Sequence, residues 1–212
     1  MRFKANQNLY IGLVTIYSEK FRLGELAGGL AKPMRTRICT VDLKSGILCP
    51  KCEEKVRSGE VTQLDLEVAK VLLSLETRYS PLQDIYFHKA VEAEDTLVIL
   101  VGREDLPKVL SCGGRLMREL SERLGKRRVR FLAYNDDKRR LLEELFAPAC
   151  ILTVNTLWLP DGSTETKVVI SKRDARRLPI SIKTIKDLAK TLMNISLRVE
   201  FEGATPYETV KS

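Results

Sequence analysis

The sequence contains a single histidine and a single tryptophan in 212 residues, and only 6% of its residues are aromatic. One histidine excludes histidine-rich metal catalysis and limits the acid–base chemistry that histidine usually performs. The chain also lacks a recognisable Ser-His-Asp set, a phosphate-binding loop and a dinucleotide-binding fingerprint. Its carboxylates are scattered without a suggestive pair. We therefore expect a binding protein; an enzyme would need an open coordination position on a bound zinc ion.

Long hydrophobic runs are missing as well. No apolar stretch approaches the roughly 20 residues that a membrane helix needs. The apolar segment 9–17 is not followed by a convincing small-residue cleavage site, so it does not fit a signal peptide. We expect a cytoplasmic protein without a membrane partner. The hydrophobic fraction of 44% is sufficient for a core, and the length allows one large or two small domains.

Positive charge is abundant but uneven. The net charge is +8. Residues 1–60 carry 11 basic and 6 acidic side chains, residues 103–130 carry 9 and 4, and residues 172–212 carry 9 and 5. Residues 61–102 reverse the balance with 3 and 7. Focused positive potential suits a polyanion such as RNA, although a solvated basic surface without such a role gives the same composition.

Hydrophobic spacing and turn residues predict the same order of elements twice: helix, two strands, two helices separated by a break, and a strand. The first set is predicted at 65–75, 84–90, 96–101, 105–110, 115–124 and 129–133. The second set is predicted at 137–146, 150–157, 167–170, 173–178, 182–193 and 195–201. Each set forms a small module in which helices cover one face of a sheet, which indicates an α+β fold class.

The predicted organisation has five parts. Residues 1–36 form an N-terminal extension with a candidate strand at 9–17, and residues 37–60 form a Cys-rich knuckle. The two modules occupy residues 61–135 and 136–202, and residues 203–212 are a tail.

Three of the five cysteines are clustered, which in a reducing compartment favours metal binding over disulfides. Cys49 and Cys52 form a Cys-x-x-Cys pair, Cys39 precedes them, and Asp42 stands where a second pair would place its fourth ligand. This set predicts a structural zinc site. Alternatives remain: His88 as the fourth ligand, a knuckle that has lost its metal, or a redox pair.

The two other cysteines lie outside this segment. Cys150 is predicted to be a small core residue. Cys112 lies between two predicted helices, where packing is the simpler role and ligand contact the alternative.

The run Leu97-Val-Ile-Leu-Val-Gly continues through Asp105-Leu-Pro-Lys-Val-Leu-Ser-Cys-Gly-Gly-Arg-Leu-Met-Arg-Glu-Leu to Leu124-Gly-Lys-Arg-Arg-Val-Arg-Phe. It resembles the KH domains of the NusA family, especially archaeal NusA-like proteins. The knuckle looks like the Cys-rich start of some archaeal members, and with the second repeat the resemblance covers about residues 37–202. It implies two tandem type II KH-like modules that bind single-stranded RNA near transcribing RNA polymerase, in elongation and termination.

A KH module clamps about four nucleotides at a Gly-x-x-Gly loop between two helices. Glycine lets the phosphates approach, and the following helix offers its N-terminal amides to them. Here the loop is Ser111-Cys112-Gly113-Gly114, in which Ser111 replaces the first glycine. Two cations follow on the next helix and could reach phosphates, Arg115 and Arg118. Three more are expected to add a basic corner near the loop: Lys126, Arg127 and Arg128. The alternative is an ordinary helix break beside a solvated basic face.

The second module departs further from the KH pattern. Its loop position holds Pro179-Ile180-Ser181-Ile182, without either glycine. Nearby cations could hold RNA by charge alone, or could dock a protein: Lys172, Arg173, Arg176, Arg177, Lys183 and Lys186. Two other functions fit the same residues. One is a ribosome-associated or RNA-processing KH protein, and the other is a protein-interaction scaffold with degenerate loops.

Overall fold

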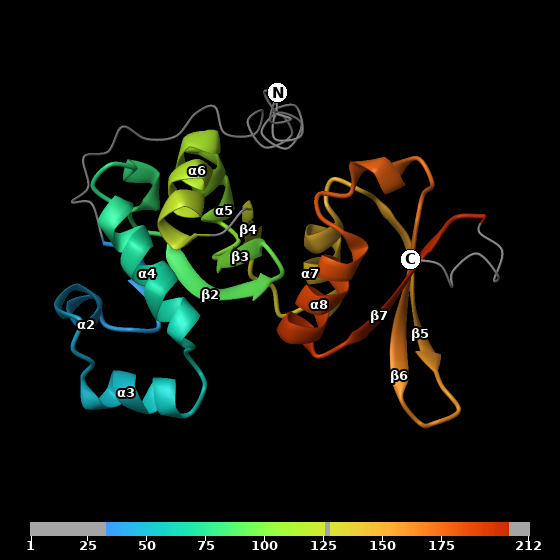
Figure 1. Cartoon of the computed structure of the whole chain (residues 1–212), viewed down its shortest axis with the longest axis horizontal. Coiled ribbons are helices and arrows are strands. Elements are labelled where there is room, and N and C mark those ends of the chain that lie inside the picture. The colour runs from blue at the N-terminus through green and yellow to red at the C-terminus, as the bar shows by residue number, and fades with distance from the viewer. Residues whose placement is uncertain (1–32, 126–127, 204–212) are drawn as a thin grey trace.

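The computed structural model describes residues 33–125 and 128–203 (Figure 1). The candidate strand at 9–17, the cations Lys126 and Arg127, and all but the first residue of the predicted tail lie outside these ranges. Within them, helices combine with one four-stranded and one three-stranded sheet, which confirms the α+β fold class. None of the helices described there is long and apolar enough to cross a membrane.

The Cys-rich segment forms a short strand and two short helices. These elements are β1 (Arg35–Thr36), α2 (Thr40–Ser45) and α3 (Pro50–Arg57). Gly46 ends α2 with a φ of 78°, a conformation that glycine adopts without steric cost. Pro50 begins α3 at the first helical position, where its missing N–H is not needed.

The first module follows directly. Its elements are α4 (Gln63–Leu75), the 3-10 helix η1 (Ser80–Leu82), β2 (Tyr86–Ala93), β3 (Thr96–Val101), α5 (Leu106–Ser111), α6 (Gly113–Leu124) and β4 (Arg128–Ala133). The sheet order is β1-β2-β3-β4, with β2 and β3 antiparallel and β3 and β4 parallel. Thr62 and Asp65 form a capping box at the start of α4. The buried Asp65 carboxylate also accepts the Ala90 amide at 2.6 Å, which ties α4 to β2.

The second module repeats the order and the strand pairing. Its elements are α7 (Lys138–Phe146), β5 (Ile151–Trp158), β6 (Thr164–Ile170), the 3-10 helix η2 (Asp174–Arg177), α8 (Ile182–Met193) and β7 (Ser196–Phe201). β5 and β6 are antiparallel, and β6 and β7 are parallel. The twofold order of elements that the sequence predicts is therefore present in the structure.

Three predicted elements need correction. The strand predicted from Asp84 begins at Tyr86, because Asp84 has a φ of 60° and closes a turn instead. The strand predicted from Lys167 begins at Thr164, since the exposed hairpin continues to pair beyond its apolar part. The helix predicted at 173–178 is a four-residue 3-10 helix, which ends before the Pro179 segment.

The two modules share buried side chains through β3, all six residues of which are buried. Leu97, Ile99 and Val101 belong to a core beneath α4, α5 and α6. Val98 and Leu100 belong to a second core with residues of α7, α8 and the second sheet. The first sheet is thus covered on both faces, which explains the continuous apolar run in β3. Figure 1 shows α7 and α8 between the two sheets. The division at residues 135 and 136 stays a prediction, since the second core crosses it.

Candidate functional site

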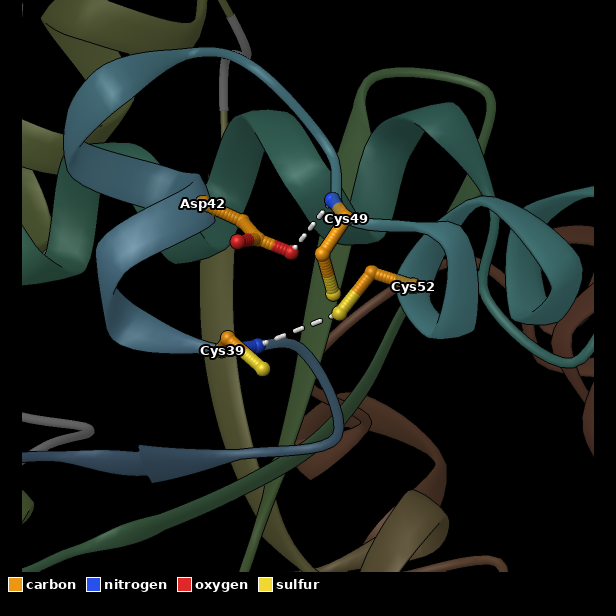
Figure 2. Close-up of side chains that lie close together, drawn as sticks. All are labelled: Cys39, Asp42, Cys49 and Cys52. Carbon is orange, nitrogen blue, oxygen red and sulfur yellow. Dashed lines mark hydrogen bonds between the residues drawn. The ribbon is translucent and has the colours of Figure 1, made fainter.

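The four predicted metal ligands come together at the starts of two short helices (Figure 2). Cys39 precedes α2 and Cys49 precedes α3, while Asp42 and Cys52 lie within those helices. Their ligand atoms all lie within 4.8 Å of one another. Asp42 and Cys52 are buried, and Cys39 is exposed. The spacing of these four residues in the sequence therefore correctly predicts that they form one cluster.

Two backbone amides donate to side chains of this cluster. The Cys39 amide donates to Cys52 Sγ at 3.4 Å, and the Cys49 amide donates to Asp42 Oδ2 at 3.0 Å. Burial raises the pKa of the Cys52 thiol to about 12, and its hydrogen bond to Asp42 acts in the same direction. That hydrogen bond is also the main cause of the lowered pKa of Asp42, followed by the Cys49 amide. Binding of a metal would require the thiol groups to lose their protons.

The donor set fits zinc. Three thiolates and one carboxylate supply four ligands, and thiolates favour zinc over calcium or magnesium. With Zn–S bonds of about 2.3 Å, sulfur atoms lie roughly 3.8 Å apart in a tetrahedral site, so only small side-chain movements are needed. Amides that already donate to ligand atoms would orient those ligands around the ion.

His88, the alternative fourth ligand, is not part of the cluster of four described here. Its ring stacks on Tyr134, with centroids 4.1 Å apart and planes 7° from parallel. The Tyr86 ring, two residues earlier on the same strand β2, lies 4.5 Å from the His88 ring. Burial, together with the charge of Arg37, lowers the pKa of His88.

The two remaining cysteines differ. Cys112 is half-buried and packs against the first core, as expected. The prediction that Cys150 is a core residue is wrong, because its side chain is exposed. The neighbouring Ala149 is buried instead, and the Cys150 amide donates to the Asp174 carboxylate at 3.2 Å.

The first predicted loop is an open bend between α5 and α6, and we call Ser111–Gly114 the first bend. Ser111 and Gly114 are exposed. Gly113 has a φ of 66°, in the left-handed region that favours glycine. A Cβ added at Gly114 would meet no atom within 4 Å. The backbone here is therefore accessible to a ligand, and α6 begins at this point.

Two of the predicted cations follow the first bend, and one lies elsewhere. Arg115 and Arg118 are exposed on the first turns of α6. Arg128 follows the other end of this 12-residue helix, which is about 18 Å long. The expectation that Arg128 lies near the first bend is therefore wrong. It lines a groove of about 390 Å³ with residues of the second module.

The second bend, residues 179–182, has a different character. Ser181 caps α8 by accepting the Thr184 amide at 3.0 Å. The predicted cations of this region are all exposed: Lys172, Arg173, Arg176, Arg177, Lys183 and Lys186. Arg177 lies 3.4 Å from the Asp174 carboxylate, and Lys183 lies 2.9 Å from Glu94 of the first module.

Sequence reasoning missed Glu94. It lies in the predicted turn between the first two strands, and its carboxylate accepts a hydrogen bond from Thr184, 90 residues away and just after the second bend. No pattern in the sequence around Glu94 predicts this contact, because it depends on how the two modules pack against each other.

The comparisons with known proteins support the fold only. No protein-family model matches the chain, and no curated protein matches it. Among 73 similar chains of solved structures is the crystal structure of a protein named APE1850. The alignment has a TM-score of 0.50 and 20% sequence identity, and it covers 67% of this chain and all of that one. At this identity the likeness concerns the fold, and the function must be argued from the site.

Proposed function

We propose that this chain is a NusA-like protein that binds nascent single-stranded RNA at the first bend during transcription elongation and termination. The observation that carries the proposal is the open backbone at Gly113 and Gly114, followed by the exposed Arg115 and Arg118. The bend begins the 12-residue helix α6, whose N-terminal amides attract phosphate. Two tandem KH-like modules of type II agree with the repeated order of elements.

The other cations have a weaker role in this proposal. Lys172, Arg173, Arg176, Arg177 and Lys186 are exposed and attract RNA through charge, which salt screens. They extend the positive surface, but the bend near them contains no glycine that would let the RNA backbone approach closely.

The knuckle supports the first module and binds one structural zinc ion in this proposal. Cys52 and the neighbouring apolar residues Ile38 and Leu43 belong to the core of that module. Val41 and Ile47 remain 72% and 77% exposed on the same segment. This exposure favours a contact with a protein partner, either RNA polymerase or the ribosome. Co-purification from cells separates the two, since polymerase subunits support transcription and ribosomal particles support the alternative.

Binding of a single-stranded RNA to the Gly114→Asp variant tests the proposal. A Cβ at position 114 has space, and a carboxylate in the first turn favours the helix, so we expect the variant to fold. The same carboxylate repels a phosphate, and we expect at least a tenfold loss of affinity in fluorescence anisotropy.

The matched control is Asn155→Asp, which adds the same charge to an exposed strand position of the second module without changing side-chain size. We expect it to alter the affinity by less than twofold. Equal affinities of wild type and Gly114→Asp, with both proteins folded, would show that RNA does not bind at the first bend.

A further inference from the structure

Glu94 is presented to the second module by the turn between β2 and β3. Ala93 pairs with Thr96, so Glu94 and Asp95 form a two-residue connection. Glu94 has a φ of 52°, which a non-glycine residue adopts only when its surroundings stabilise it. The turn thereby projects this carboxylate away from the first sheet and toward α8.

Three donors at the start of α8 hold the Glu94 carboxylate. Oε2 accepts hydrogen bonds from the hydroxyls of Thr184 and Ser181. Oε1 lies 2.9 Å from the ammonium group of Lys183. The hydrogen bond from Thr184, and then that from Lys183, lower the pKa of Glu94. The carboxylate therefore pairs with the Thr184 hydroxyl and the Lys183 ammonium group, and the Ser181 hydroxyl lies 3.5 Å from it.

The position of this carboxylate matters because α8 has 12 residues, and its N-terminus carries a partial positive charge. In a KH module this is where a nucleic-acid phosphate approaches. Here the groove beside it is lined by Glu94 and Asp95 as well as by Arg128. A phosphate that entered the groove would be repelled by the Glu94 carboxylate, which already pairs with side-chain donors at the start of α8.

We propose that the Glu94 carboxylate takes the place of an RNA phosphate at the second bend. The second bend then connects the two modules, and we call this contact the joint. RNA is clamped at the first bend alone. The inference rests on the proposed RNA-binding function. It assigns the positions of Ser181, Lys183 and Thr184 to the inter-module contact. One consequence is a short RNA footprint, because a single KH bend holds about four nucleotides.

The first experiment uses inorganic phosphate as the probe and needs no RNA. Amide resonances of Lys183 and Thr184 are followed by NMR during titration of wild type and Glu94→Gln. We expect no saturable shift in wild type and a saturable shift at these amides in the variant. The exposed Glu67 on α4 provides the control, and Glu67→Gln should behave as wild type. The proposal would be contradicted if phosphate bound saturably at these amides in wild type, or if it failed to bind there in Glu94→Gln.

The second experiment compares single-stranded RNAs of 5 and 10 nucleotides. Wild type should bind both within about twofold, whereas Glu94→Gln should prefer the longer RNA by about tenfold. Its salt dependence should steepen by about 0.7 in slope for each additional phosphate contact. Tenfold preference for the longer RNA in wild type would contradict the joint.

The two proposals fail in different ways. If wild type binds neither RNA while the phosphate titration behaves as expected, the RNA-binding function is wrong and the joint stands. If wild type binds RNA and Glu94→Gln gains nothing in either experiment, the joint is wrong and the function stands. Thermal melting of each variant confirms that it is folded before the comparison.

Discussion

The two bends occupy equivalent places in two modules of the same topology, yet they differ in what surrounds their helix N-termini. At the first bend, Gly113 adopts a left-handed conformation and Gly114 faces open space. At the second bend, Ser181 caps the helix and Glu94 from the other module holds the neighbouring donors. Equal topology therefore does not imply equal chemistry, since a site depends on the side chains placed on the fold.

The first test of this comparison concerns the knuckle, which belongs to the first module alone. Cys49→Ser should purify without stoichiometric zinc, as measured by elemental analysis, because the site loses one of its thiolates. A structural zinc ion contributes on the order of 10 kcal/mol of apparent free energy in small zinc peptides. We therefore expect a large fall in the thermal midpoint.

Cys150→Ser is the control for the zinc test, since Cys150 is exposed and lies outside the cluster. It should retain wild-type zinc content. A zinc-free wild-type protein with the stability of its zinc-loaded form would show that the knuckle is held by packing.

The second test asks whether the modules can be separated. Phe146 on α7 is fully buried in the core that also contains Val98 and Leu100 of the first module. Phe146→Ala should lower the free energy of unfolding by about 3–5 kcal/mol. Because the core is shared, circular dichroism and the amide NMR signals of both modules should report one coincident denaturant transition. Two separate transitions would mean that the modules fold independently. The control is Leu152→Ala at an exposed position, which should change the free energy of unfolding by less than about 0.5 kcal/mol.

Much of this fold follows from the sequence, and the reason is local. The predicted bounds of the strand 96–101 and the helix 182–193 agree with the structure because continuous apolar residues and amphipathic spacing are strong signals. The clustering of Cys39, Asp42, Cys49 and Cys52 is predicted correctly because these residues are close in the sequence, and two of them form a Cys-x-x-Cys pair. The RNA-binding assignment remains a prediction.

What the sequence did not predict depends on packing between modules. The contact of Glu94 with Thr184 joins residues 90 positions apart, and Arg128 lies beside the second bend although it follows the helix of the first. The exposure of Cys150 has a local origin, because the residue type does not determine which of two neighbours, Ala149 or Cys150, points into the core. Periodicity reveals which face of an element is buried, and not which partner covers it.

The third test compares the loss of RNA affinity when one cation is removed at each bend. Arg115→Gln should reduce RNA affinity about three- to tenfold and should flatten the salt dependence by about 0.7 in slope, as expected for one lost phosphate contact. Lys183→Gln should have a smaller effect, within about twofold, since its ammonium group already pairs with Glu94. Equal losses in the two variants, measured by anisotropy over a salt series, would place RNA at both bends.

The smallest expected effect is a pH dependence of the joint. The pKa of Glu94 is lowered in the folded protein, so its contribution to stability is complete above the unfolded pKa and is lost as the pH falls through the folded pKa. The charged groups around it are Lys183, Asp95 and Arg128. Wild type and Glu94→Gln should therefore differ slightly in thermal midpoint at pH 7 and should converge in strongly acidic solution. If the two thermal midpoints still differ in strongly acidic solution, the difference does not come from the charge of Glu94.

Mapping the bound RNA by NMR determines which of the two bends clamps RNA. A five-nucleotide single-stranded RNA is titrated into the full chain, and amide shifts at the two bends are compared. We expect saturable shifts at Gly113, Gly114 and Arg115 and none at Lys183 or Thr184. Saturable shifts centred on the second bend, with the first bend unaffected, would contradict it.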